Sequence, residues 1–274
     1  LSMFPLRGVR TVGLLRRTNG HRLFSSSIRL LDAEGVVKKP APFNPRHMGV
    51  ANQVYIPPSK KNMPNPITSP IAFFNVMIRK MYTLGMNTIQ VALFRYQSGY
   101  KPQFLLWKNK AIETYVQVNK AFANRQLEDI KPHVSIWVDE ALTSRSKQIP
   151  AGITLDWELI KFNEVPKLVS TQAMMIPGRP VELIQLIYKF DTKQRLIKFN
   201  KKSGKADKLD RDVIDYVAFL CDASTNDILL IGSVFESAPD EKLPKDSETS
   251  NKIVIERMKT NGDLFRVPPP AKKN

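Results

Sequence analysis

The spacing of apolar side chains changes its period part-way along the chain. Between residues 70 and 150 they recur every three to four positions, and after residue 150 they alternate with polar ones. The first spacing is typical of a helix with one apolar face, and the second of a strand with one buried face. The sequence therefore predicts helices in the first half and adjacent strands in the second.

Two helices are predicted at the start of this region. The first covers residues 70–84 and ends at Gly85, and a shorter one covers 88–96 and ends at Ser98-Gly99. The apolar stripe of the first helix consists of Ile71, Phe74, Ile78 and Met81.

The clearest helical pattern covers residues 104–122. Its apolar stripe consists of Phe104, Trp107, Ala111, Tyr115, Val118 and Phe122. A further helix is predicted to begin near Ile130. Its inward residues are expected to be Ile130, Val134, Trp137 and Ala141, and its outward residues Asp139, Glu140, Ser144 and Arg145. Amphipathic helices of this kind pack on a flat apolar surface.

Alternation of apolar and polar residues predicts strands in the second half. They cover residues 154–163, 167–177, 181–190, 195–200, 212–222 and 228–236. Residues 191–194 and 224–227 are expected to form turns. The stretch KKSGKADK, residues 201–208, lacks the first glycine of a phosphate-binding loop and is interpreted as a solvated hairpin tip. A last helix is predicted over 248–260, followed by Gly262 and a basic tail.

Helices followed by a run of strands indicate the α+β class, in which a helical layer packs on a curved antiparallel sheet. We expect this core over residues 70–238, and a C-terminal helix with the basic tail over 239–274. Residues 32–69 are proline-rich and lack periodicity. They are expected to form an extended arm that becomes ordered only on a partner.

Residues 1–31 have the composition of a mitochondrial presequence. They contain six arginines and no acidic residue, and their leucines and valines are spaced so that an induced helix is amphipathic. We expect cleavage near Phe24 or a few residues later, since Arg22 lies two residues before this aromatic and Ser25 follows it. A disordered RNA-binding arm is the alternative, but such arms are usually rich in lysine.

The charge balance favours a polyanionic partner. The chain has 42 Lys+Arg and 25 Asp+Glu, so that without the six arginines of residues 1–31 the balance is 36 against 25, a net charge of about +11. Such an excess suits either ribosomal RNA or an anionic lipid surface and does not choose between them. No apolar run is long enough to span a bilayer, because the best one, 70–82, is interrupted by Asn75 and by Arg79-Lys80.

Few residues suit catalysis or metal binding. The chain has one cysteine, Cys221, and three histidines, no two of which have the helical spacing of metal ligands. No cofactor is expected. A curved α+β sheet can still enclose the pocket of an isomerase or dehydratase, for which Asp156 and Tyr188 are the candidate bases. We favour ordinary roles for these two residues, a strand-edge carboxylate and a core aromatic.

A resemblance extends over nearly all of the chain after residue 31. The segments that carry it are FNPRHMGVAN (43–52), VALFRYQSGYKPQFLLWKNKAIETY (91–115), LDWELIKFNEVPKLVS (155–170), YKFDTKQRLIKFN (188–200) and LDRDVIDYVAFLCDASTNDILLIGSVFES (209–237). Together they resemble the fungal mitochondrial inner-membrane ribosome receptors. That family is related to the mitochondrial large-subunit ribosomal protein numbered forty-five and to the membrane-docking domain of the import-motor scaffold.

The resemblance implies a cone similar to the nuclear-transport-factor-two fold, attached peripherally to the matrix face of the inner membrane. It also implies binding to the large ribosomal subunit near the tunnel exit, which is held against the Oxa-type insertase while hydrophobic respiratory-chain subunits are made. Nascent hydrophobic chains are then further partners, and no enzymatic reaction is implied. A constitutive protein of the large subunit needs the same fold and charge, so the sequence alone does not separate these two functions.

Charge and hydrophobicity give two candidate binding surfaces. The helix at 70–84 combines apolar bulk with cations, as helices in a membrane interface do. The membrane-binding candidates are Phe73, Phe74, Met77, Arg79, Lys80 and Met81. The candidates for contact with ribosomal phosphates are Arg46, Lys60, Lys61, Lys198, Lys201, Lys202, Lys205 and Lys208. The alternatives are a helix whose aromatics pack into the core and lysines that are only solvated.

Overall fold

The centre of the fold is a four-stranded antiparallel sheet in the order β1-β2-β3-β4. Its strands are β1 (Ile153–Met174), β2 (Leu183–Asn200), β3 (Lys205–Asp222) and β4 (Ile228–Val234). This computed structural model describes residues 43–50, 54–176, 181–241 and 250–268. The predicted presequence, the first part of the predicted arm and most of the predicted basic tail lie outside the described residues. Residues Asn44–Asn274 form one compact unit, to which everything below refers.

The strands are fewer than predicted, and β1, β2 and β3 are longer, whereas β4 ends two residues earlier than predicted. The strands expected at 154–163 and 167–177 are one strand, β1, whose register against β2 shifts at four places between Leu159 and Ser170. Such bulges let a strand continue past irregular positions, including Pro166.

The turn predicted at 191–194 was wrong, because these residues lie inside β2. Thr192 is fully buried and pairs with Val213, and the register between β2 and β3 is unbroken from Leu183 to Asn200. Turn-prone residues stay in a strand when strands on both sides supply backbone partners. The chain turns instead at residues 201–204, where Gly204 has a φ of 65°. The predicted hairpin tip is therefore confirmed.

Within the described residues, four α-helices accompany the sheet. They are α1 (Pro70–Ser98), α2 (Phe104–Asn124), α3 (Ile136–Gln148) and α4 (Asn251–Gly262). The prediction of two helices separated at Gly85 was wrong, since α1 continues through this residue. A glycine inside an exposed helix costs about 1 kcal/mol but does not end the helix. The predicted end at Gly99 is confirmed by its left-handed conformation, with a φ of 73°.

Helix α2 is confirmed, with Trp107, Ala111, Tyr115 and Val118 buried. Helix α3 begins later than predicted. A short 3-10 helix, Leu127–His133, contains Pro132 and precedes it, and the Ser135 hydroxyl caps α3 by accepting a bond from the Val138 amide.

Of the residues predicted to face inward, only the two that precede α3 are buried. Ile130 and Val134 are buried, but inside α3 the buried residues are Val138 and Leu142. Trp137 and Ala141, which were predicted to face inward, are half-buried. Trp137 donates a hydrogen bond of 3.0 Å from Nε1 to the His47 carbonyl instead.

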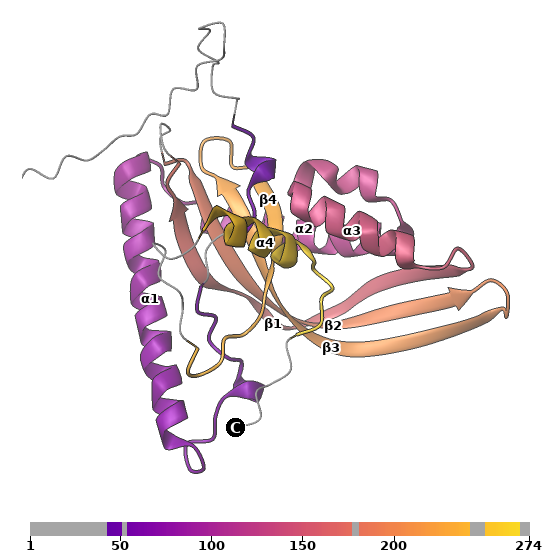
Figure 1. Ribbon diagram of the computed structural model, residues 1–274, viewed down its shortest axis with the longest axis horizontal. Coiled ribbons are helices and arrows are strands. Elements are labelled where there is room, and N and C mark those ends of the chain that lie inside the picture. Colours follow the sequence, from indigo (N-terminus) through magenta and orange to yellow (C-terminus); the bar gives the residue numbers. More distant parts are fainter. Residues whose placement is uncertain (1–42, 51–53, 177–180, 242–249, 269–274) are drawn as a thin grey trace, which may run out of the picture. The chain divides into compact units, whose positions relative to one another are not determined.

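The two faces of the sheet have different covers, and Figure 1 shows α1 along one edge. We call the face of the sheet on which α2 packs the helix-side face. There the ring of Tyr115 stacks on the ring of Phe190, with centroids 4.4 Å apart. We call the opposite face, on which the chain before α1 lies, the arm-side face. There the backbone of Ile56 exchanges two hydrogen bonds with Ser237. The described part of the predicted arm thus packs on its own chain.

Candidate functional site

Helix α1 faces the sheet with polar side chains. The Asn87 side chain donates to the Val169 carbonyl at 2.8 Å and accepts from the Thr171 amide at 3.0 Å, and Gln90 accepts from the Ala173 amide at 3.1 Å. These backbone groups belong to the outer edge of β1. The amides of α1 therefore replace a neighbouring strand and satisfy groups that an edge strand otherwise leaves open.

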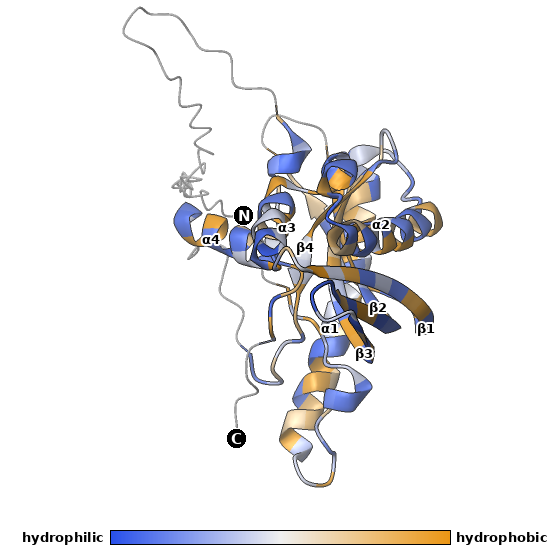
Figure 2. Cartoon of the chain, turned by 90° about the vertical axis from the view of Figure 1, so that its right-hand side faces the viewer, coloured by the Kyte–Doolittle hydropathy of each residue, from blue (hydrophilic) through white to orange (hydrophobic). Residues whose placement is uncertain are grey.

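The opposite side of α1 is apolar and exposed to solvent. We define the outward stripe as Ile71, Phe74, Ile78, Met81, Tyr82, Ile89 and Tyr96, all of which are 58% to 89% exposed. Figure 2 shows hydrophobic segments along the projecting part of α1. A helix of a soluble protein ordinarily turns its apolar stripe toward the core. Helix α1 is inverted in this respect, and an exposed apolar surface of this extent is typical of an interaction site.

The predicted membrane-binding residues divide between the two sides of α1. Phe74, Met77, Lys80 and Met81 are exposed, and Phe73 is half-buried. The alternative in which the aromatics pack into the core therefore fails for Phe74.

Arg79 is turned toward the body of the protein. Its guanidinium lies over the Tyr55 ring, 5.2 Å from the centroid, and donates to the Glu241 carbonyl. Arg79 thus helps to hold α1 in place, because it is bound to residues outside the helix on the side that faces the sheet.

The predicted ribosome-binding residues do not form one cluster. Five of them, Lys198, Lys201, Lys202, Lys205 and Lys208, are exposed around the tip of the β2–β3 hairpin. Lys60 and Lys61 lie in a short 3-10 helix, Lys60–Asn62, on the arm-side face. Arg46 lies in another, Pro45–His47, where Nε donates to the Val134 carbonyl at 3.3 Å and Nη2 lies 3.8 Å from Asp139.

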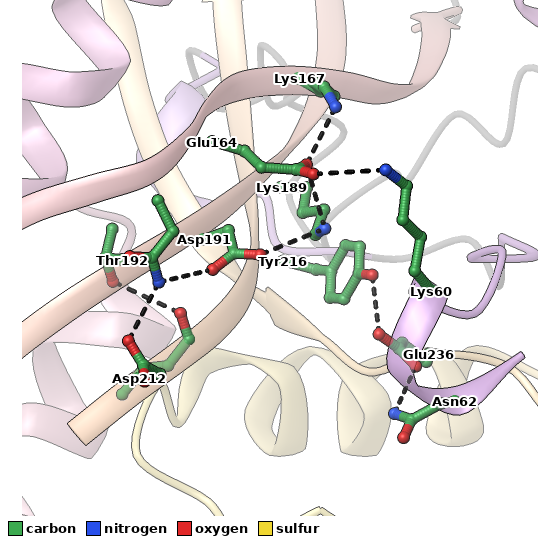
Figure 3. Close-up of polar contacts among 12 residues, drawn as sticks. Lys60, Asn62, Glu164, Lys167, Lys189, Asp191, Thr192, Asp212, Tyr216 and Glu236 are labelled. Atoms are coloured by element: carbon green, nitrogen blue, oxygen red, sulfur yellow. Dashed lines mark hydrogen bonds and ion pairs between the residues drawn. The ribbon is translucent and has the colours of Figure 1, made fainter.

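A network of charged and polar groups joins the arm to three strands (Figure 3). Glu164 lies 2.9 Å from Lys167, 3.6 Å from Lys189 and 3.9 Å from Lys60. The hydrogen bond from Lys167, together with the charges of the other lysines, lowers the pKa of the Glu164 carboxyl. Lys60 is thus partly neutralised within the chain, which weakens its case as a phosphate contact.

A second polar network lies on the helix-side face. The Tyr115 hydroxyl donates to Asp215 at 2.5 Å, and the Gln194 amide donates to that hydroxyl at 2.7 Å. Burial raises the pKa of the Asp215 carboxyl, against the bonds from Tyr115 and Gln194 that lower it. The tyrosine and the carboxylate are fixed by protein groups, which is the arrangement of a structural network.

The two residues considered as catalytic bases are not brought together. Asp156 is exposed and pairs with Ile197 on the arm-side face, whereas Tyr188 is buried on the helix-side face. Among the described residues no group of three or more His, Cys, Asp or Glu could hold a metal ion. Within the same residues, no helix combines the length and apolar character needed to cross a bilayer.

A comparison with known protein families shows to which family this chain belongs. The family described as MBA1-like protein matches residues 34–270. The chain belongs to the MBA1-like protein family. Its similarity extends to a characterised member, the protein named inner membrane mitoribosome receptor MBA1, mitochondrial, of Saccharomyces cerevisiae. The two are 58% identical over 262 residues, which cover 93% of this chain and 94% of that protein.

Several residues that define α1 in this MBA1-like protein were not found from sequence. They are Asn87 and Gln90 on the sheet side, and Tyr82, Ile89 and Tyr96 in the outward stripe. One signal for this region is present in the sequence, because no Asp or Glu occurs between Glu34 and Glu113. A long stretch without carboxylates, containing an apolar helix, is typical of a surface that meets lipid or another polyanion.

Proposed function

We propose that this protein is a peripheral receptor for mitochondrial ribosomes on the matrix side of the inner membrane. The similarity to the yeast inner membrane mitoribosome receptor supports this function over nearly the whole chain. The observation that carries the membrane part is the outward stripe of α1, which is exposed while the polar side of the same helix binds β1. The protein acts by binding and is not an enzyme.

The outward stripe inserts among lipid chains while α1 stays on the sheet. Burial of apolar surface contributes about 25 cal/mol per Å², and the stripe offers seven large exposed side chains for burial among lipid chains. Lys80 is exposed but lies seven residues before Asn87, on the side of α1 away from the stripe, so the apolar side chains of the stripe make the membrane contact. Because the bonds of Asn87 and Gln90 lie on the other side, membrane binding requires no rearrangement of the sheet.

The second surface, the tip of the β2–β3 hairpin, contacts the large ribosomal subunit near the tunnel exit. The receptor thereby holds the exit against the Oxa-type insertase, so that nascent hydrophobic subunits of the respiratory chain pass directly into the membrane. In this proposal the sheet and helices form a cone similar to the nuclear-transport-factor-two fold. Residues 1–31 act as the presequence, residues 70–238 as the core, and residues 32–69 and 239–274 as flanking segments.

A constitutive protein of the large subunit is the second candidate. The charge excess of the chain suits both functions. The similarity to a protein named as a mitoribosome receptor of the inner membrane favours the first candidate.

Two binding measurements test the proposal. Purified protein is floated with vesicles of inner-membrane lipid composition, and it is sedimented with mitochondrial large subunits that lack it, over a range of salt concentrations. A receptor binds both, and its binding to the subunit weakens steeply with salt. Binding to subunits that persists at high salt, without binding to vesicles, would identify a built-in ribosomal protein.

A matched pair of variants assigns the membrane contact. Phe74→Glu with Ile78→Glu places two charges in the outward stripe, and Gln117→Glu with Asn124→Glu adds the same charge on exposed positions of α2. We expect the first variant to lose vesicle binding by tenfold or more, while it retains its melting temperature and its binding to the subunit. The second variant is expected to bind vesicles like the wild type. Equal flotation of both variants would remove α1 from the membrane contact.

A further inference from the structure

The β2–β3 hairpin has two faces that differ in charge. Side chains alternate between faces along a strand, and residues paired across strands share a face. Trp157, Gln194 and Thr192 contact Tyr115 or one another, which fixes their face as the helix-side face. Glu164 contacts Lys60 of the arm, which fixes the other, arm-side face. The pairing of β1, β2 and β3 then assigns each paired residue of the projecting part, which consists of residues 153–161 and 193–212, to one face.

On the arm-side face the charges balance. Glu158, Arg195 and Asp210 form a row across three strands, with Arg195 lying 3.7 Å from Glu158 and 2.8 Å from Asp210. The hydrogen bond from Arg195 lowers the pKa of Asp210. Altogether this face of the projecting part has four cations and four carboxylates, which are Lys161, Lys193, Arg195, Lys208, Asp156, Glu158, Asp210 and Asp212.

On the helix-side face and at the turn the charges do not balance. The cations are Lys198, Lys201, Lys202, Lys205 and Arg211, and the carboxylate is Asp207. Within the described ranges of the chain, none of these five cations has a carboxylate within 4.0 Å. All five are exposed. Lys208, which the sequence grouped with them, belongs to the other face, whereas Arg211 joins them.

We propose that the helix-side face of the hairpin, with its turn, is the surface that binds the phosphate backbone of RNA, and that the arm-side face is not. This inference rests on the proposed ribosome receptor function, and it assigns the ribosome contact to one face of the hairpin. The difference lies in the charge of each whole face, since Lys161, Lys193 and Lys208 of the arm-side face also have no carboxylate within 4.0 Å among the described residues. Five cations and one carboxylate give the helix-side face a net positive charge that attracts phosphates, whereas the four carboxylates of the arm-side face repel phosphates and offset its four cations.

The reach of this surface fits a nucleic acid. Lys205 and Arg211 lie six residues apart on one strand, a distance of about 20 Å at about 3.4 Å per residue, which spans several phosphates. A lipid surface is a poorer fit, because among the described residues that strand pairing assigns to this part of the helix-side face, Leu209 is the only exposed large apolar residue. Interfacial binding needs apolar side chains that enter the lipid.

The test compares two triple variants with the same change in net charge. The helix-side variant is Lys198→Gln, Lys205→Gln and Arg211→Gln, and the arm-side variant is Lys161→Gln, Lys193→Gln and Lys208→Gln. Binding of the full protein to mitochondrial large subunits is measured as a function of salt. Each phosphate contact contributes about 0.7 to 0.9 to the slope of log affinity against log salt, so we expect the helix-side variant to reduce the slope by about 2 to 3. The arm-side variant is expected to keep the wild-type slope.

Equal slopes for the two variants, or a larger loss in the arm-side variant, would overturn the inference while the receptor function stood. Absence of saturable binding by the wild-type protein would instead overturn the proposed function itself. The source of the phosphate is checked with phosphatidylcholine vesicles that contain phosphatidylglycerol. A helix-side variant that bound these vesicles less tightly but bound subunits normally would show that the surface meets lipid and not RNA. Circular dichroism and thermal melting of both variants establish that the fold is intact.

Discussion

Asn87 is expected to fix α1 to the sheet. Its two bonds, at 2.8 Å and 3.0 Å, join the helix to backbone groups on both sides of residue 170 in β1. A hydrogen bond contributes about 1 kcal/mol net, and a buried polar group left without a partner costs about 1 to 3 kcal/mol. Thr171 is only 3% exposed, so water does not easily replace the lost partner of its amide. We therefore expect Asn87→Ala to destabilise the protein by about 2 to 3 kcal/mol.

Urea unfolding and amide hydrogen exchange measure this effect. Because α1 buries only Val76, Thr83 and Phe94 within its length, the loss should appear first as faster exchange along α1, and then as lower global stability. For a protein of this size the melting temperature falls by about 2 to 4 °C per kcal/mol, so a decrease of about 4 to 12 °C is expected.

Two further variants make the Asn87 prediction specific. Asn75→Ala changes the same residue type at an exposed position of the same helix and should alter stability by less than about 0.5 kcal/mol. Asn87→Asp keeps an acceptor for the Thr171 amide, loses the donor to Val169 and places a carboxylate against that carbonyl. It should destabilise the protein at neutral pH at least as much as Asn87→Ala. If Asn87→Ala behaved like Asn75→Ala, the amide would not be holding the helix, and the account of α1 would be wrong.

Two other predictions concern the buried network and the packing of α4. Because folding raises the pKa of Asp215, the native state holds its proton to higher pH than the unfolded chain, so this residue lowers stability as pH rises above its unfolded pKa of about 3.9. Asp215→Asn should therefore gain stability relative to the wild type as pH rises from 3 to 7 in urea titrations, and a difference that stayed constant with pH would refute this. A Cβ on Gly262 would lie 2.7 Å from the Trp137 carbonyl oxygen, so Gly262→Ala should destabilise the protein by about 1 to 3 kcal/mol in thermal melts. Gly85→Ala, where a Cβ meets nothing within 4 Å, should be stabilising by up to about 1 kcal/mol, and the same response at both glycines would contradict the packing argument.

The spacing of apolar residues was sufficient to predict the α+β class and helix α2. The stripe from Trp107 to Val118 faces the core because every apolar residue in it has a sheet to pack on. The turn with Gly204 and the helix end at Gly99 were also predictable, since a left-handed backbone favours glycine. The same kind of reasoning failed at residues 191–194, where pairing with neighbouring strands outweighed the turn preference of the residues.

The sequence alone determined that α1 has an apolar stripe, but only the tertiary structure decided which way the stripe faces. Periodicity identifies an apolar side and cannot say whether the core or something outside the chain will cover it. The decision came from Asn87 and Gln90, whose partners lie about 80 residues further along the chain. The sidedness of the hairpin cations likewise depends on the register of three strands, because a shift of one residue would move each lysine to the opposite face.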